Sequence, residues 1–348
     1  MPGPCSVSVV LPVKRDTDAF RQALGALRAA SPAADDVIIV TDGLVPAAAD
    51  AARAAGFRLV VHEPAGGPAA ARNTGARASD ADVLLFVDAD VAVSPTLIGR
   101  VHDAFGDANL AAVVGCYDDS PPETNFFSQY KNLLQRFVHL HARRQGSTFW
   151  GACGAVRRRV FLDAGGFDER FRLPSVEDIE LGYRITRAGH RIEFRPELEI
   201  THLKRWTMTS LLASDIFRRA VPWTWLLMRE SAVEANLNLG WGSRLAAVLA
   251  IALAISLAAA VVEPRALLAA ALAAALLVVI DRELAAFFRA RRGAWFASRA
   301  IAWHWVYYIY SAAAFGAATL SYPMVGKRRM ARAGERAVPL PSAGRGAL

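Results

Sequence analysis

Two acidic residues interrupt an apolar run in the stretch LLFVDADVAV, residues 84–93, which contains Asp88 and Asp90. Burial of an unpaired carboxylate is costly, so these side chains need a cation, a pair of basic groups or solvent beside them. Their spacing of two leaves the middle residue free to point away where a strand ends. Such a D-x-D sequence is either the start of an ordinary turn or a site for a hard divalent cation.

A second acidic pair, Glu177 and Asp178, follows a glycine-containing loop in GGFDERFRLPSVEDIELGYRITRAGH, residues 165–190. The pattern predicts that these two residues open a helix. The helix dipole favours acids in a first turn, and that effect alone would explain both residues. The alternative is that one of them carries out proton transfer.

The elements that must position these acids alternate between short β-rich runs and helical patterns from residue 7 to residue 117. Strand and helix alternating at this spacing predict a parallel, doubly wound sheet. Pro46 and Pro95 fit first helical turns, Ser94 fits an N-cap and Gly56 fits a helix end. The expected strands lie within SVVLPV, DVIIVT, FRLVVH, VLLFVD and LAAVVGC, and the expected helices are 17–30, 46–55, 68–78 and 95–105.

Unusual residues follow three of the expected strands. In open α/β sheets, ligands bind beyond the carboxyl ends of the strands, so we expect these residues to converge at one edge. Pro12, Val13 and Lys14 end the first strand, Asp42 and Gly43 end the second, and Asp88 and Asp90 end the fourth.

The segment from residue 126 to residue 206 predicts further elements of the same domain. We expect a helix over 126–144, a strand turning into a helix within TFWGACGAVRRRVF, and the helix that begins at Glu177. The runs RIEFR and LEITHL read as two paired strands.

Composition and charge narrow the class of protein. The chain has 348 residues, of which 54% are hydrophobic, and the apolar excess lies after residue 240, which indicates a membrane portion. Its three cysteines, Cys5, Cys116 and Cys153, form no C-x-x-C pair, so disulfides and structural zinc are not expected. The start, MPGPCSVSVVLPV, lacks the features of a signal peptide, so the first part is expected in the cytosol.

The net charge of +8 is concentrated in two clusters beside apolar segments. That placement favours anionic lipid headgroups as partners and gives no indication of nucleic acid binding. One cluster contains Arg289, Arg291 and Arg292, and the other contains Lys327, Arg328, Arg329, Arg332 and Arg336.

Three uncharged runs follow residue 240: 245–262, 266–280 and 300–322. The first two, joined by Glu263-Pro264-Arg265, predict a helical hairpin in a bilayer, although the second is short for the roughly 20 residues that a span needs. A buried helical domain of a soluble protein is the alternative. Trp and Tyr at one end of the third run resemble interfacial anchors.

The orientation of these runs raises a conflict. Three full spans would put the basic tail on the side opposite a cytosolic catalytic part, against the tendency of Lys and Arg to remain inside. One run is then re-entrant or interfacial, or the tendency is broken. The segment 211–228, with Trp223, Trp225, Arg218 and Arg219, fits either a helix in the headgroup layer or a packing helix against the sheet.

Several motifs, in this order, resemble those of the family 2 glycosyltransferases, which are inverting enzymes with the GT-A fold. The resemblance covers about residues 6–206. It rests on SVVLPVKRD, VTDG, GGPAAARNTGARASDADVLLFVDAD, GGFDE and VEDIELGYRITRAGH. It implies a Rossmann-like, mostly parallel sheet with flanking helices, followed here by a C-terminal helical membrane region.

The resemblance implies roles for the residues in these motifs. A divalent cation, Mn²⁺ or Mg²⁺, would bridge the diphosphate of a nucleotide-sugar donor, with Asp90 as its ligand and Asp88 near the ribose and the metal waters. His202 matches the position of an occasional third ligand. Asp42 would contact the nucleoside, although Thr41 replaces the first acid of the family's D-D-G-S, which leaves the base open.

Lys14 and Arg72 are the basic residues that could approach the nucleotide or its phosphates, with Pro12 and Val13 beside them; surface solvation is the alternative for both side chains. The resemblance also implies that Asp178 is the base that takes the acceptor proton, with Glu177 assisting or binding the acceptor. LKRWT after His202 matches the family's R-W acceptor motif only in part.

The sequence thus predicts a catalytic domain over 1–206, juxtamembrane helices over 207–240, a transmembrane region over 241–325 and a basic tail over 326–348. The expected function is transfer of a sugar to a lipid-linked acceptor, a polyprenyl phosphate or a glycolipid, by a multi-pass protein of the inner membrane. Alternatives are a non-catalytic membrane scaffold and an enzyme acting on a cell-surface saccharide. A nucleotidyltransferase is disfavoured because LPVKRDTD lacks glycine, and a transporter because the apolar runs contain no acid.

Overall fold

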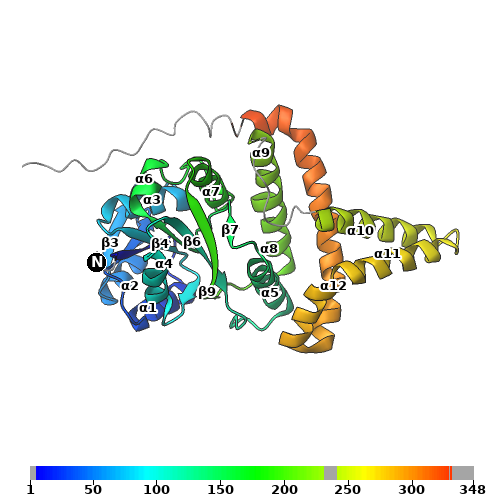
Figure 1. Ribbon diagram of the computed structural model, residues 1–348, viewed down its shortest axis with the longest axis horizontal. Coiled ribbons are helices and arrows are strands. Elements are labelled where there is room, and N and C mark those ends of the chain that lie inside the picture. Colours follow the sequence, from blue (N-terminus) through cyan, green and yellow to red (C-terminus); the bar gives the residue numbers. More distant parts are fainter. Residues whose placement is uncertain (1–4, 231–240, 329, 331–348) are drawn as a thin grey trace, which may run out of the picture.

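The computed structural model describes residues 5–230, 241–328 and 330. Residues 1–4, 231–240, 329 and 331–348 lie outside this description, and with them Arg329, Arg332, Arg336 and most of the expected basic tail. A nine-stranded sheet with helices on its faces forms the part that the sequence predicts to be catalytic, called the catalytic half below, and a set of long helices lies beside it (Figure 1). The mostly parallel α/β architecture and the C-terminal helical region agree with the sequence prediction.

The alternating first third folds as its pattern predicts. Strands and helices follow in the order β1 (Val7–Val13), α1 (Asp18–Ala29), β2 (Asp36–Asp42), α2 (Pro46–Ala54), β3 (Arg58–His62), α3 (Pro68–Ala78), β4 (Val83–Val87), β5 (Val91–Val93), α4 (Leu97–Phe105) and β6 (Leu110–Tyr117). Pro46 begins α2, and Gly56 after its end has a φ of 78°. Ser94 is not an N-cap, because α4 begins at Leu97 after Thr96.

The second part of the catalytic half adds α5 (Phe126–Leu140), β7 (Gln145–Gly146), β8 (Cys153–Arg157), α6 (Arg158–Asp163), α7 (Glu177–Arg187) and β9 (Arg191–His202). The strand order is β3-β2-β1-β4-β8-β6-β9-β5, with β7 on β9. β8 enters antiparallel between β4 and β6, and β5 is antiparallel to β9. The sheet is therefore mixed, where the alternation alone predicted parallel strands.

One long strand replaces the pair expected at RIEFR and LEITHL. β9 continues through Pro196, and its pairing with β6 steps from Phe194 opposite Val114 to Glu199 opposite Cys116. This irregularity accommodates the proline, which cannot donate a backbone hydrogen bond in the ladder. The prediction of two paired strands was wrong, because the chain continues through Pro196 as one strand.

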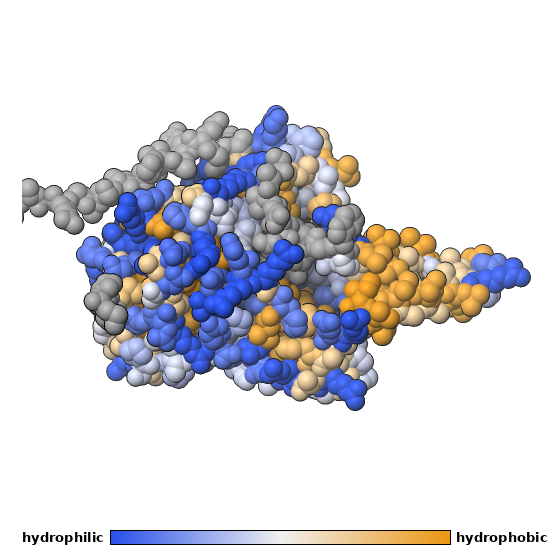
Figure 2. All heavy atoms as spheres, in the orientation of Figure 1, coloured by the Kyte–Doolittle hydropathy of each residue, from blue (hydrophilic) through white to orange (hydrophobic). Residues whose placement is uncertain are grey.

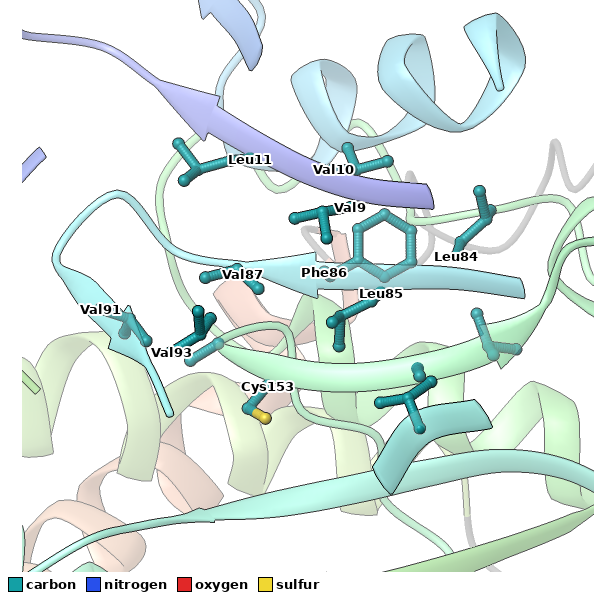
Figure 3. Close-up of a cluster of buried hydrophobic side chains, with 14 of the residues drawn as sticks. Val9, Val10, Leu11, Leu84, Leu85, Phe86, Val87, Val91, Val93 and Cys153 are labelled. Atoms are coloured by element: carbon teal, nitrogen blue, oxygen red, sulfur yellow. The ribbon is translucent and has the colours of Figure 1, made fainter. Parts of the chain in front are cut away.

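The main core lies on both faces of this sheet. The β4 strand VLLFV is completely buried, which matches its continuous apolar run. Figure 3 shows Val87 near the end of β4, a loop beyond it, and the short strand that carries Val91 and Val93. Asp88 and Asp90 lie in that loop, so the core on either side of them fixes where the two acids are held.

The helices after residue 206 form two groups. α8 (Met208–Ala213), the π-helical η1 (Ser214–Ala220) and α9 (Val221–Arg229) run along the catalytic half. α12 (Arg282–Ser321) crosses them and contacts α9, η1 and α5; its path turns at Gly293, which has a φ of 81°. The π-helical η2 (Tyr322–Gly326) ends the series.

The expected hairpin is present as α10 (Trp241–Ala259) and α11 (Ala266–Ile280), which pack against each other. It projects away from the rest of the molecule with an apolar surface and a hydrophilic tip (Figure 2). Among the described helices, α10 alone has the length and composition for a bilayer crossing, over Gly242–Ala259, and α11 is shorter.

Two segments that the sequence placed at a membrane, one of them with packing as the alternative, have protein partners. Trp223 donates to the Tyr183 hydroxyl and Trp225 to the carbonyl of Ala318, so 211–228 is largely a packing segment. Arg291 pairs with Asp119, and Arg292 donates to the side chain of Gln129 at 2.7 Å.

The third apolar run is the second half of α12. It buries His304 and Tyr308 along its length.

Candidate functional site

The D-x-D loop is placed by strand pairing. Val91 of β5 lies opposite His202 of β9, and the amide of Leu203 donates to the carbonyl of Asp90 at 2.9 Å. These backbone contacts bring Asp90 next to the end of β9. His202, which follows Asp90 by more than 100 residues in sequence, is thereby its neighbour.

Asp90 and His202 present two metal-binding atoms to the same space. Asp90 Oδ2 and His202 Nε2 are 3.9 Å apart. The His202 ring stacks on Tyr117 with centroids 4.6 Å apart, and burial lowers the pKa of His202 to about 3. Burial also raises the pKa of Asp90. The imidazole is thus held neutral.

Asp88 is directed to the other side of the loop, where it meets Arg72 of α3. Arg72 Nη2 donates to Asp88 Oδ1 at 2.6 Å, and Arg72 Nη1 donates to Glu177 Oε1 at 3.2 Å. Arg72 and Glu177 are both about 95% buried, since each side chain is 5% exposed. One guanidinium therefore links the strand that carries the D-x-D pair to the helix that carries the second acidic pair.

Glu177 and Asp178 form the first turn of α7, as predicted. Asp178 accepts from the amide of Gly151 at 3.1 Å and from that of Ile179 at 2.8 Å. Burial raises the pKa of Asp178; burial, together with the charge of Asp178, raises that of Glu177 to about 7. A Cβ at Gly151 would lie 3.0 Å from the Arg72 guanidinium, so a glycine is required for this close approach.

Asp42 lies at the end of β2, on the same edge of the sheet. Its Oδ1 accepts from the amides of Gly66 at 2.7 Å and Gly67 at 3.0 Å, and its Oδ2 is 4.0 Å from Lys14 Nζ. The carboxylate therefore holds the loop before α3, and the Lys14 side chain is exposed beside it. Pro12 and Val13 end β1 next to this group.

A cavity of about 200 Å³ begins at Asp178 and extends between the catalytic half and the helices after residue 206. Its polar wall includes Lys131, Asp215 and Arg219. The sequence left Arg219 in a segment that fitted either the headgroup layer or packing, and it did not single out Lys131 or Asp215. No local motif marks these residues, because α5, η1 and α12 meet only in the folded chain.

The structure thus brings the predicted acids, Arg72 and His202 to one edge of the sheet. Within the described residues, no three His, Cys, Asp or Glu side chains are grouped to hold a metal ion by themselves. Asp88 is paired with Arg72, which leaves Asp90 and His202 as the two available protein ligands. The individual roles assigned to these side chains remain predictions.

Replacing Arg72 tests the link between the two acidic pairs. In Arg72→Gln, Glu177 loses the cation that lowers its pKa, so the folded protein must hold an unpaired buried carboxylate at pH 8 but a neutral acid at pH 5. We expect a loss of about 3 kcal/mol in the free energy of unfolding at pH 8, and a smaller loss at pH 5.

Urea unfolding at both pH values measures this difference. Arg77→Gln is the matched control on the same helix, because its 3.7 Å ion pair with Glu169 is partly exposed, and it should cost less than about 1 kcal/mol at either pH. Equal losses for the two variants would contradict the assigned role of Arg72.

Comparison with known proteins assigns the domain. Residues 8–165 match the model of the family "Glycosyl transferase family 2". A pre-mycofactocin glycosyltransferase of Mycobacterium tuberculosis is 30% identical over 220 residues, which cover 61% of this chain and 45% of the relative. A validoxylamine A glucosyltransferase of Streptomyces hygroscopicus is 31% identical over 232 residues, covering 54% of each chain. The chain spans about half the length of these relatives.

The fold extends beyond the family match. A mannosyltransferase from Pyrobaculum calidifontis, solved with GDP-Man and Mn²⁺, aligns with 93% of this chain and 88% of its own, at a TM-score of 0.58 and 17% identity. This similarity concerns the fold, including the helices after residue 206. The motifs and the family match thus identify residues 8–165 as a glycosyl transferase family 2 domain, and the shared architecture is that of the GT-A fold.

Proposed function

We propose that this protein transfers a sugar from a nucleotide-diphosphate donor to a lipid-linked acceptor at the cytosolic face of a membrane. The observation that carries the proposal is the arrangement around Arg72. Arg72 hydrogen-bonds to Asp88 in the D-x-D loop and to Glu177 at the start of α7, so this one side chain connects the two acidic pairs. Asp90, in the same loop as Asp88, lies beside His202. A donor sugar held beside Asp90 would lie between the two acidic pairs.

A divalent cation, Mn²⁺ or Mg²⁺, fits Asp90 and His202. Ligand atoms lie about 2.1 Å from Mg²⁺, and about 2.0–2.2 Å for nitrogen and oxygen on comparable ions, so two atoms 3.9 Å apart can share one ion. With two protein ligands, the remaining positions are left to diphosphate oxygens and water. When bound, such an ion neutralises the charge that develops on the leaving diphosphate.

The nucleoside end of the donor would lie over β1 and β2. Asp42 secures the loop at Gly66 and Gly67, and the exposed Lys14 ammonium is the cation nearest to it. Pro12 and Val13 would form the floor, and Asp88 would face the ribose from the D-x-D loop. These assignments follow the predicted roles, and the arrangement at one sheet edge supports them.

Asp178 is the proposed base. Two backbone amides hold its carboxylate, and its position at the cavity mouth leaves room for an acceptor group. A hydroxyl acceptor would give its proton to Asp178 as it attacks the anomeric carbon from the side opposite the leaving group. Glu177 is paired with Arg72 and would act by positioning rather than by proton transfer.

The hairpin supports membrane attachment. At 1.5 Å per residue, the 18 residues of Gly242–Ala259 span about 27 Å, close to the roughly 30 Å of a bilayer core. Its surface exposes large apolar side chains, among them Val248, Ile255 and Leu272, while Glu263 and Arg265 occupy the tip. Insertion along its length would place this charged tip at the far headgroups.

A two-helix insertion also removes the conflict over orientation. Two crossings return the chain to the side on which it entered, and α12 then stays with the catalytic half, where it packs on α5, η1 and α9. Lys327 and Arg328 would lie on the cytosolic side, in agreement with the tendency of basic residues to remain inside.

Donor binding tests the first part of the proposal. The full chain should bind at least one of a panel of UDP-, GDP- and dTDP-sugars in calorimetry with Mn²⁺ present, and lose this binding when the metal is chelated. Asp90→Asn should weaken metal-dependent binding by about 10-fold or more, since a charged ligand is removed. Asp103→Asn on α4 is the control. Binding that is unaffected by chelation would refute the metal assignment.

The role of Asp178 depends on the acceptor. With a hydroxyl acceptor, Asp178→Asn should lower kcat by about 10²–10⁴-fold. Because burial raises the pKa of Asp178, the wild-type rate should fall with decreasing pH, from a higher pH than an ordinary aspartate would give, as the base becomes protonated. With a phosphate acceptor, which needs little base catalysis, both effects should be small.

Membrane insertion is tested by charges on the exposed hairpin surface. The wild-type chain should remain with inner membranes through an alkaline wash. Val248→Arg with Leu272→Arg should release it, because each arginine near the bilayer centre costs about 2.5–3.5 kcal/mol on insertion. Leu44→Arg, at an equally exposed leucine in the catalytic half, should not. Retention of the double variant would contradict insertion of the hairpin.

A further inference from the structure

The cavity at Asp178 contains a cationic side chain, Arg219, whose charge acts on Asp178 without a direct contact. Arg219 lines this cavity and is half-buried, and no described residue forms an ion pair or hydrogen bond with its guanidinium. A guanidinium in this position carries five N–H donors in a rigid fork that matches phosphate geometry. An anionic group is the natural partner for it.

Lys131 and Asp215, at the same end of the cavity, already pair with each other. Asp215 is buried and accepts from Lys131 Nζ at 2.6 Å and from the Tyr310 hydroxyl at 2.8 Å. Asp215 and Arg219 both belong to the π-helical η1, a form that is frequent at functional sites. Fixing Asp215 between α5 and α12 therefore also fixes the segment that directs Arg219 into the cavity.

The opposite end of the cavity is apolar and continues toward the hairpin. A second cavity, of about 950 Å³, shares lining residues with the first, including Leu134, Val138, Leu227 and Phe315. It reaches Ala247 of α10 and Ile280 at the end of α11. Polar groups at Asp178 are thus connected by apolar walls to the helices proposed to enter the bilayer.

We propose that these joined cavities bind a lipid whose phosphate lies at Arg219 and whose hydrocarbon chain follows Leu134, Leu227 and Phe315 toward α10. This inference rests on the proposed function and narrows its acceptor from any lipid-linked group to a lipid phosphate, such as a polyprenyl phosphate. Arg219 offsets the repulsion that the acids of α7 would exert on that phosphate.

The reaction then requires no proton transfer. A phosphate oxygen attacks the anomeric carbon, a carbon–oxygen bond forms there, and the bond from that carbon to the donor diphosphate breaks. Its electron pair leaves with the diphosphate. The products are a glycosyl phospholipid and a nucleoside diphosphate, and Asp178 positions the acceptor without acting as a base.

Binding of purified lipids to the full chain in detergent tests the phosphate site. Trp150 and Trp223 line the first cavity and provide a fluorescence signal. Arg219→Gln should raise the Kd for undecaprenyl phosphate by about 10–100-fold and leave the Kd for uncharged undecaprenol unchanged. Arg219→Lys should have an intermediate effect. Arg218→Gln, an exposed neighbour on the same turn, is the control with the same change of charge and should bind as wild type.

Two further ligands test whether the site prefers a lipid phosphate to free phosphate or to a phospholipid headgroup. Inorganic phosphate should bind weakly if the hydrocarbon chain contributes, and phosphatidylglycerol should compete poorly if a terminal phosphate is required. Leu227→Trp should obstruct the passage and weaken binding of undecaprenyl phosphate, whereas Leu227→Ala should retain it. Equal affinities of wild type and Arg219→Gln for undecaprenyl phosphate would overturn the proposal, as would equal wild-type affinities for undecaprenol and its phosphate.

These outcomes are separate from failure of the proposed function. Metal-dependent binding of the nucleotide sugar should be the same in wild type and Arg219→Gln, since Arg219 is outside the donor edge of the sheet. If donor binding is intact and lipid phosphate does not bind, the acceptor assignment alone fails. If no donor binds to the wild-type chain, the proposed function fails whatever the lipid result.

Discussion

The whole site depends on one buried ion pair system, in which Arg72 holds Asp88 with one guanidinium nitrogen and Glu177 with another. These acids belong to parts of the chain that form different elements, a loop after β4 and the first turn of α7. Buried like charges repel, so two acidic pairs could not share a sheet edge without a cation between them. Arg72 supplies that cation from α3, and the small residue Gly151 gives the guanidinium the space it occupies. The catalytic geometry is therefore coupled to correct packing of α3 on the sheet.

The sheet itself explains why the proposed donor edge and the proposed acceptor cavity can adjoin. The parallel strands β1, β2 and β4 end at the donor side, whereas β8 runs in the opposite direction between β4 and β6. The segment before β8 consequently reaches the same edge from the other direction. It brings Trp150 and Gly151 to Asp178, so a single reversed strand separates the nucleotide side from the acceptor side.

Most of the fold and much of the site could be read from sequence, for a physical reason. Apolar runs that end in Lys14, Asp42 or Asp88 indicate where the strands end. Because the carboxyl ends of parallel strands lie at one edge of the sheet, these residues were expected to lie together. Long-range partners cannot be read in this way. The pairing of Arg291 with Asp119 requires knowing where α12 returns, and the cavity residue Lys131 resembles any polar residue on a helix. The continuation of β9 through Pro196 depends on the irregular pairing that β6 offers, which is a property of the partner strand.

The helices that line the cavity come from both sides of the hairpin in sequence, which has a consequence for truncating this protein. α9 precedes the hairpin and α12 follows it, yet Leu227 from the first and Tyr307 and Phe315 from the second face the same space. A fragment that stops before the hairpin would keep the proposed nucleotide-sugar edge and lose one side of the proposed acceptor compartment. On these assignments, the fragment would bind the nucleotide sugar without retaining a lipid.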